Sequence, residues 1–343
     1  MRIFSYHNKR LLRRTLLIIL LAVLLIAAVV ICRFIYLARF IRYDDTGAHL
    51  DYSQDLTPVY PPTGGEPETE EEFPFDTVIV SSDSVESEPL QKLHGYYITA
   101  SMLAEDVQRV RDALNTLQDC NAIMIDVKSV FGNFYYSSKL AGATMATVDI
   151  DAVDALIRDL LAMKDVTVIA RIPAFSDPNY ALAHQTQGLP LYTGALWTDE
   201  NGCYWLNPYS NDVQAWVSTI AIELSNLGFD EVLIDDFRFP DSDRISWNDP
   251  SVTPRDAILD AADVVSANLT GYRAYVAFGT DDPEIAAFCD RAYITCDDPA
   301  EIGALLSAME PAVENAETEL VFLTASHDTR FDVCGVLRPL LEE

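Results

Sequence analysis

Two adjacent aspartates, Asp235 and Asp236, follow the apolar run 232–234 and are well placed for acid–base or nucleophilic chemistry. Unpaired charge is costly to bury, so two carboxylates directly after a buried strand indicate a site more than packing. Neighbouring strand residues point to opposite faces, so one aspartate should face a pocket while the other holds a loop or Arg238. The alternative is that both form ion pairs that lock the loop.

Further charged residues stand at the ends of other predicted strands. Asp126 and Lys128 are two residues apart, so they share one face of a strand and either pair with each other or bind substrate hydroxyl groups. Arg171 ends the next predicted strand, where it could hold a carboxylate such as Asp235 or reach a ligand directly. These three side chains are therefore predicted to shape a pocket.

Cleavage of a glycosidic bond is one reaction that such residues could perform, because it uses two carboxyl groups, one as acid and one as nucleophile or base. Asp235 is the predicted nucleophile or base. Two further acidic pairs follow later strands and are candidates for the second carboxylate: Asp281 and Asp282, and Asp297 and Asp298. Each pair precedes a proline, which is also an ordinary way to begin a helix, so a capping role is the alternative.

Aromatic residues near the same strand ends could form apolar platforms for sugar rings. Trp205 and Tyr209 flank Asn207 and are the pair predicted to lie at a pocket. Other aromatic residues have the same potential, although many are expected in the core: Tyr97, Phe131, Tyr135, Phe175, Trp197 and Phe237.

The elements that must position these residues form a repeating pattern from residue 94 onward. Short β-rich runs alternate with helical stretches, which is typical of βα units around a parallel sheet. The predicted strands are 95–100, 122–127, 166–172, 231–237, 272–278, 291–295 and 320–324. The predicted helices are 102–118, 149–163, 211–227, 254–269, 299–309 and 331–341, with Ser101, Asp149 and Ser210 as caps of the first three and Gly228 after the third.

About 250 residues of βα units predict an α/β fold of the (β/α)8 TIM-barrel type, in which reactive side chains gather at the C-terminal ends of the strands. Seven strands are evident, so the barrel is predicted to be incomplete or to take an eighth strand from 132–137 or 202–206. A doubly wound open sheet is the competing architecture, but no glycine-rich phosphate fingerprint follows the first strand.

The N-terminal part of the chain has a different composition. Residues 16–32 carry no charge, and with 34–36 they approach the roughly 20 residues that cross a bilayer, so 15–36 is predicted to be an uncleaved transmembrane helix. Five basic residues precede the uncharged run and three follow it, Arg33, Arg39 and Arg42, which predicts a cytoplasmic 1–14 and an extracellular C-terminal domain at the cell membrane. Residues 43–93 read as an acidic disordered linker, which leaves 94–343 as the barrel domain.

Charge and cysteine usage exclude several classes of function. The net charge of −30 excludes a nucleic-acid partner, which would need a basic surface. The six cysteines show no C-x-x-C spacing, so neither a zinc site nor a disulfide scaffold is indicated. No metal and no cofactor are predicted, and the lipid bilayer is a partner through the N-terminal helix.

Five segments in this order resemble DUF4015, a bacterial family of barrel domains inferred to be glycoside hydrolases: 95–100, 125–128, 170–178, 205–210 and 228–240. The resemblance covers roughly residues 94–245 and implies a catalytic aspartate at Asp235 and an extracellular or cell-wall polysaccharide as partner. The family has an aromatic residue where this chain has Asp236, and often an aspartate in place of Asn207. From about residue 272 the chain matches poorly, so a non-catalytic carbohydrate-binding or envelope-organising protein on the same fold is the alternative.

Overall fold

The computed structural model describes residues 41–44, 47–50, 89–117, 119–247 and 251–341, and the chain divides into two units, Met1–Glu70 and Glu71–Glu343. In the first unit, β1 (Ile41–Asp44) and β2 (Gly47–Leu50) pair as antiparallel strands. β2 lies inside the segment 43–93 that was predicted to be a linker, and β1 overlaps the start of that segment. No helix among the described residues is long and apolar enough to cross a bilayer. The transmembrane helix predicted at 15–36 lies outside the described residues.

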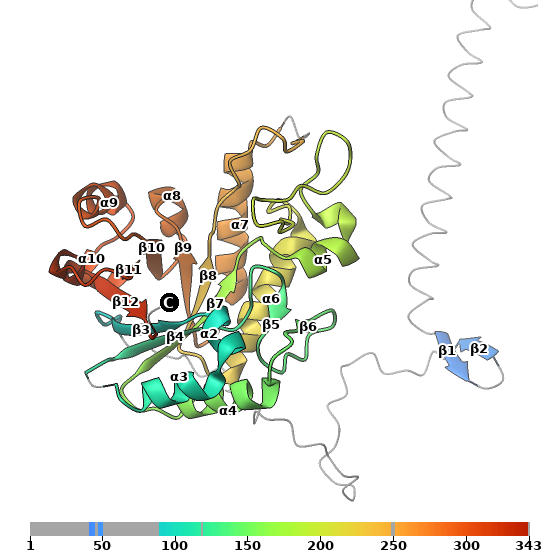
Figure 1. The fold of residues 1–343 in the computed structure, drawn as a ribbon. Helices are drawn as coiled ribbons and strands as arrows, with labels where there is room; N and C mark the ends of the chain where they lie inside the picture. Colours follow the sequence, from blue (N-terminus) through green and yellow to red (C-terminus); the bar gives the residue numbers. More distant parts are fainter. Residues whose placement is uncertain (1–40, 45–46, 51–88, 118, 248–250, 342–343) are drawn as a thin grey trace, which may run out of the picture. The chain divides into compact units, whose positions relative to one another are not determined.

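The second unit is a closed barrel of eight parallel strands (Figure 1). Around the barrel they are β3 (His94–Ile98), β4 (Ala122–Asp126), β7 (Thr167–Pro173), β8 (Glu231–Asp235), β9 (Tyr275–Gly279), β10 (Arg291–Thr295), β11 (Leu320–Leu323) and β12 (Gly335–Pro339). The last strand pairs with the first, with Val336 opposite His94. The barrel prediction is therefore confirmed and the barrel is complete, whereas the open-sheet alternative is wrong.

The eighth strand lies where the sequence predicted a helix over 331–341. Residues Thr329–Val333 form a short 3-10 turn (η2), and β12 follows directly. Val336 packs in the outer core while Leu337 packs inside the barrel, which is the two-residue period of a strand. Pro339 would also disrupt a helix interior. Neither alternative segment joins the barrel, because β5 (Asn133–Phe134) pairs with β6 (Thr144–Met145) and 202–206 makes isolated bridges to loops.

Helices follow the strands and bury their apolar faces against the outside of the barrel. They are α2 (Ala100–Glu105), α3 (Val107–Leu114), α4 (Ile150–Leu161), α5 (Pro178–Ala183), α6 (Asn211–Leu227), α7 (Pro254–Leu269), α8 (Pro283–Ala286), α9 (Ile302–Met309) and α10 (Ala316–Glu319), with a short 3-10 turn η1 (Gln185–Gln187). Asp149 and Ser210 cap α4 and α6, and Gly228 ends α6 with φ 104°, as predicted.

The first predicted helix is in fact two helices. Asp106 has an extended backbone that ends α2, and its carboxylate accepts hydrogen bonds from Gln108 N and Arg109 N at the start of α3. Thr99, two residues before the predicted Ser101, caps α2 by accepting a hydrogen bond from Met102 N. The capping aspartate Asp106 therefore divides the segment that the helical pattern had predicted to be one continuous helix.

The barrel interior is polar at its N-terminal end and apolar in its middle. At the N-terminal end, Glu231 forms an ion pair with Arg291 and accepts a hydrogen bond from Tyr293 Oη at 2.5 Å, with all three groups buried. Arg291 Nη2 also donates to Gln91 O at 3.0 Å. Above this network lies an apolar layer: Ala122, Met124, Ile169, Leu233, Ala277, Val321, Leu323 and Leu337. The base of the barrel is closed, so a ligand can enter from the C-terminal ends of the strands.

Candidate active site

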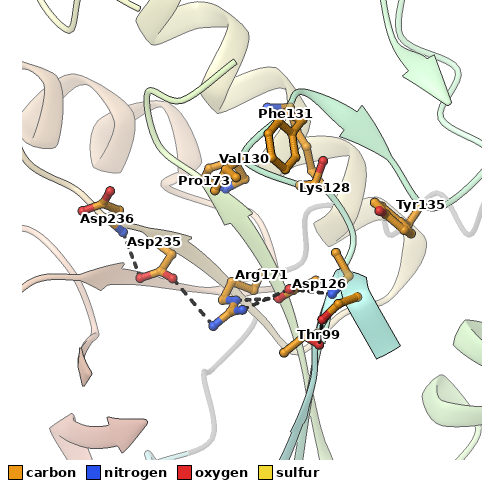
Figure 2. Close-up of a pocket in the computed structure, with 13 residues that line it drawn as sticks. Thr99, Asp126, Lys128, Val130, Phe131, Tyr135, Arg171, Pro173, Asp235 and Asp236 are labelled. Atoms are coloured by element: carbon orange, nitrogen blue, oxygen red, sulfur yellow. Dashed lines mark hydrogen bonds and ion pairs between the residues drawn. The ribbon is translucent and has the colours of Figure 1, made fainter. Parts of the chain in front are cut away.

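A pocket of about 320 Å³ opens at the C-terminal ends of β3, β4, β7 and β8 (Figure 2). Strand alternation explains why charged groups meet there. Met124, Ile169 and Leu233 point into the barrel, and the residues two positions later point the same way. Those residues are the ones that the sequence singled out as charged strand exits: Asp126, Arg171 and Asp235.

Arg171 lies between two carboxylates contributed by the neighbouring strands. Its Nε and Nη2 donate to Asp126 Oδ1 and Oδ2 at 2.5 and 3.0 Å, while its Nη1 lies 3.7 Å from Asp235 Oδ2 (Figure 2). Asp126 also accepts a hydrogen bond from Ala100 N, the first residue of α2, at 2.9 Å. We call Asp126, Arg171 and Asp235 the acidic triad. Arg171 holds Asp235, which is one of the two predicted roles of this arginine. The two hydrogen bonds of Arg171, however, go to Asp126.

The surroundings of Asp235 and Arg171 change the pKa of both groups. Burial in the barrel mouth raises the pKa of Asp235 above its ordinary value, although Arg171 and a hydrogen bond of 2.8 Å from Asp236 N act in the opposite direction. Burial alone would lower the pKa of Arg171, but the carboxylates of Asp126 and Asp235 raise it, so the guanidinium stays charged. With both carboxylates ionised, the acidic triad carries a net charge of −1.

Asp236 occupies a different position from Asp235, as the alternation argument required. Its carboxylate pairs with Arg238, and both side chains are about half exposed. Its φ of +53° interrupts the strand geometry, so Asp236 also reaches the rim of the pocket. Asp235 therefore belongs to the acidic triad, while Asp236 holds Arg238. Arg238 itself lies 5.3 Å from the ring of Trp205 and does not line the pocket.

Lys128 lines the pocket, but the predicted pair between Lys128 and Asp126 is wrong. Lys128 Nζ lies 3.0 Å from Asp177 Oδ2, with 2% and 3% of the side chains exposed. Asp177 also accepts hydrogen bonds from Tyr180 N, at the start of α5, and from Trp216 Nε1. The strand ends at Asp126, so the two-residue spacing no longer holds at Lys128. Asp177 was missed because Asp177-Pro178 reads as a simple helix start.

The predicted aromatic pair does not line the pocket. Trp205 is 3% exposed, donates to Asp199 Oδ2 at 3.0 Å and packs against Trp197. Asn207 accepts a hydrogen bond from Tyr209 N within a turn, and Tyr209 is partly exposed away from the pocket lining. Their segment belongs to the long connection between β7 and α6, and none of the three lines the pocket. Two other aromatic candidates line it instead, Phe131 and Tyr135.

The four later aspartates are all described, and none of them lines the pocket. Asp282 caps α8 and pairs with Arg255, and Asp298 accepts a hydrogen bond from Ala300 N. Asp297 accepts from Thr324 Oγ1 and Ala325 N, while Asp281 is exposed. The capping alternative therefore holds for Asp282, whereas Asp298 lies in the turn before α9, whose N-cap is Glu301.

Metal and thiol chemistry find little support in the described residues. No group of three or more His, Cys, Asp and Glu side chains within them could hold a metal ion. Their five cysteines, Cys120, Cys203, Cys289, Cys296 and Cys334, are free thiols, and burial raises the pKa of each. The titratable side chains of the pocket that carry carboxyl or basic groups are Asp126, Lys128, Arg171, Asp235 and Asp236.

The fold and the pocket define a parallel (β/α)8 barrel with a carboxylate site at the C-terminal ends of its strands. Residues 95–281 match the model of the family DUF4015, described as "Putative glycosyl hydrolase domain", and the chain belongs to this family. The matched region contains Asp126, Arg171 and Asp235 and ends before β10. No curated protein matches the chain significantly.

Several solved structures are similar to this chain. A hypothetical protein from Ruminiclostridium thermocellum ATCC 27405 is 26% identical over 53% of this chain and 96% of that chain, with a TM-score of 0.44. Alpha-L-fucosidase isoenzyme 2 from Paenibacillus thiaminolyticus is 12% identical over 68% and 40%, with a TM-score of 0.48. Aspergillus fumigatus Ega3, in complex with galactosamine, is 11% identical over 75% and 95%, with a TM-score of 0.46.

Proposed function

We propose that this chain is a glycoside hydrolase in which Asp235 acts as nucleophile or base. The observation that carries the proposal is the position of Asp235, which lies at the end of the fourth barrel strand inside the pocket, held by Arg171 and by Asp236 N. Groups at this end of a barrel strand are where enzymes of this fold place their chemistry. Membership of the glycosyl hydrolase domain family supports the same reaction class.

The charge of the acidic triad suits this reaction. Glycosidic cleavage passes through a transition state in which the sugar ring resembles an oxocarbenium ion and carries positive charge. Carboxylates that are already held in place at the pocket stabilise that charge as it develops, without reorganisation of the site. Arg171 orients Asp235 while Asp126 orients Arg171, so Asp126 is a positioning residue.

Asp236 is the proton donor in this proposal. Among the described residues, three carboxylates line the pocket, and Asp126 is already fixed to Arg171 by two hydrogen bonds. Asp236 pairs instead with Arg238 at the half-exposed rim, where a leaving sugar would depart.

We also propose that the domain acts outside the cell, on an extracellular or cell-wall polysaccharide, from a single N-terminal membrane anchor. The uncharged run 16–32 and the basic residues before it support this placement. The test is fractionation of cells that express the full-length chain, followed by protease treatment of intact cells. An anchored extracellular domain remains with the membrane in alkaline carbonate and is cut from outside. Release by carbonate, or protection from protease, would contradict the placement.

A second candidate is a non-catalytic glycan-binding protein on the same barrel. Its support is that Asp126 and Asp236 are both engaged in ion pairs, so neither of them is free to act as the second carboxyl group that cleavage needs. Both candidates predict glycan binding, and they differ in whether a bond is cut.

The experiment measures binding and the release of new reducing ends with a panel of polysaccharides: neutral glucans and mannans, glycol chitin, chitosan and bacterial cell-wall polysaccharide. If Asp235 is catalytic, Asp235→Asn lowers kcat/KM by about 10²–10³ or more and leaves Tm within a few degrees. Asp263→Asn, an exposed aspartate on α7, is the matched control and should retain full activity. Undiminished turnover in a stable Asp235→Asn protein contradicts the catalytic assignment, and binding without cleavage by the wild type establishes the second candidate.

A further inference from the structure

The connection between β4 and β5 presents two consecutive apolar side chains at the pocket. Val130 is 44% exposed and Phe131 is 53% exposed, and both line the pocket. Figure 2 shows the Phe131 ring across the pocket from Arg171 and Asp235. We call Val130 and Phe131 the apolar tip. Exposing a phenylalanine side chain to water has a cost in free energy that burial against a ligand would remove.

The apolar tip is held rigidly by its polar neighbours. Ser129 N donates to Asn133 O and Gly132 N donates to Ser129 O, both at 2.9 Å, which closes a tight turn around the tip. Gly132 has φ +79°, a conformation that glycine adopts without strain. Hydrogen bonds and backbone angles within the turn thus fix the conformation of the turn.

A second set of hydrogen bonds ties this turn to the segment that begins α5. Ser176 Oγ donates to Val130 O at 2.8 Å, and Asn179 Nδ2 donates to Gly132 O at 3.0 Å. The buried Lys128–Asp177 ion pair joins the same two segments directly behind the turn. A turn with this many ties keeps its backbone in place, so little backbone entropy is lost when a ligand binds to the ring that it carries.

A pyranose ring has the chemistry that fits this surface. One face of the ring exposes C–H groups that pack on an aromatic ring, while its hydroxyl groups point outward to polar partners. The pocket offers both kinds of partner, with the apolar tip on one side and the carboxylates of the acidic triad on the other.

We propose that Phe131, supported by Val130, is a sugar-stacking subsite beside the acidic triad. The substrate is then a glycan chain of at least two sugar units, with one ring at the acidic triad and a neighbouring ring on Phe131. This inference rests on the proposed function and deepens it. The subsite requires the substrate to be a chain of sugars, whereas the pocket alone would accept a single sugar.

The test uses the full-length protein and labelled oligosaccharides of one to six units, made by partial acid hydrolysis of the polysaccharide that the wild type binds or cleaves in the panel above. Phe131→Ala should weaken the affinity for the four-unit and longer oligosaccharides by about tenfold. Affinity for the single sugar should change less than twofold, and Phe131→Trp should retain tight binding of the longer chains. Leu182→Ala is the matched control, because Leu182 is also 53% exposed, lies on α5 and does not line the pocket.

The outcomes separate this inference from the proposed function. Equal affinity of wild type and Phe131→Ala for every chain length overturns the subsite while leaving the proposed function intact. An equal loss for the single sugar and the longer chains also overturns it, because Phe131 would then shape the triad side of the pocket. If the wild type neither binds nor cleaves any polysaccharide of the panel, the proposed function is itself contradicted, and the subsite with it.

Discussion

The carboxylate of Asp235 occupies the space in which a side chain of residue 279 would lie, and residue 279 is a glycine. A Cβ at Gly279 would be 2.0 Å from Asp235 Oδ1 and 2.9 Å from Asp235 Cα. Gly279 ends β9, the strand beside β8, and it is not among the glycines with positive φ. The glycine is therefore needed for space and not for backbone conformation.

Replacing this glycine should disturb the site specifically. Gly279→Ala must displace the Asp235 carboxylate from its present position, and it also presses on the backbone at Asp235 and Asp236. We expect cleavage or binding of the glycan to fall at least tenfold, with a decrease in Tm of several degrees. Gly303→Ala is the control, since no atom lies within 4 Å of a Cβ there, and it should leave both properties unchanged. Full activity of Gly279→Ala would show that Asp235 does not need its present position.

The stability of the wild type should depend on Asp235 in a predictable direction. Its folded-state pKa is raised above the ordinary value of 3.8, mainly by burial, so the folded protein binds this proton more readily than the unfolded chain. The resulting contribution to stability is complete below pH 3.8 and is lost as the pH rises through the raised pKa. Asp235→Asn does not titrate, so its Tm relative to wild type should rise as the pH increases from about 4 to 7.

Thermal unfolding of both proteins at several pH values checks this prediction. Residues of active sites are often not optimal for stability, so a variant that gains stability while losing function would fit a functional carboxylate. A drop in Tm of many degrees at pH 7 would instead mean that Asp235 is a structural partner of Arg171, because breaking a buried pair costs roughly 3–5 kcal/mol.

The buried network at the base of the barrel should contribute to stability without affecting the pocket. Glu231→Gln leaves Arg291, which is 2% exposed, without its anionic partner. We expect the free energy of unfolding to fall by roughly 3–5 kcal/mol. Arg109→Ala breaks the exposed pair with Glu105 and should cost less than about 1 kcal/mol. Urea unfolding measures both, and equal effects of the two variants would contradict this account.

The same network places the start of the folded unit before residue 92. Gln91 O accepts a hydrogen bond from Arg291, and Asn121 Nδ2 donates to Lys92 O at 2.9 Å. A shortened protein beginning at Pro89 should therefore be more stable than one beginning at Lys92, by about 1–3 kcal/mol, because the second leaves a donor of Arg291 unpaired. Identical urea midpoints for the two proteins would show that water replaces the carbonyl of Gln91 without cost.

The sequence by itself determined the positions of the charged strand exits. Apolar runs ending in Asp126, Arg171 and Asp235 mark where strands leave the core, and the two-residue period fixes that each charged side chain points into the barrel mouth. Capping signals such as Ser210 and Gly228 were equally readable, because each depends on hydrogen bonds within a few residues of the cap. Interactions that depend on a few neighbouring residues can therefore be predicted from those residues alone.

The tertiary structure decided which of these groups meet. Lys128 pairs with Asp177 and not with Asp126, because the chain turns after β4 and brings a later loop behind it. Arg171 takes Asp126 as its main partner because β4 and β7 are adjacent in register. The strand β12 was missed, since five residues that include a proline acquire their hydrogen bonds only from β11 and β3. Pairing across strands depends on closure of the whole barrel, and that closure joins residues far apart in sequence, so no local pattern encodes it.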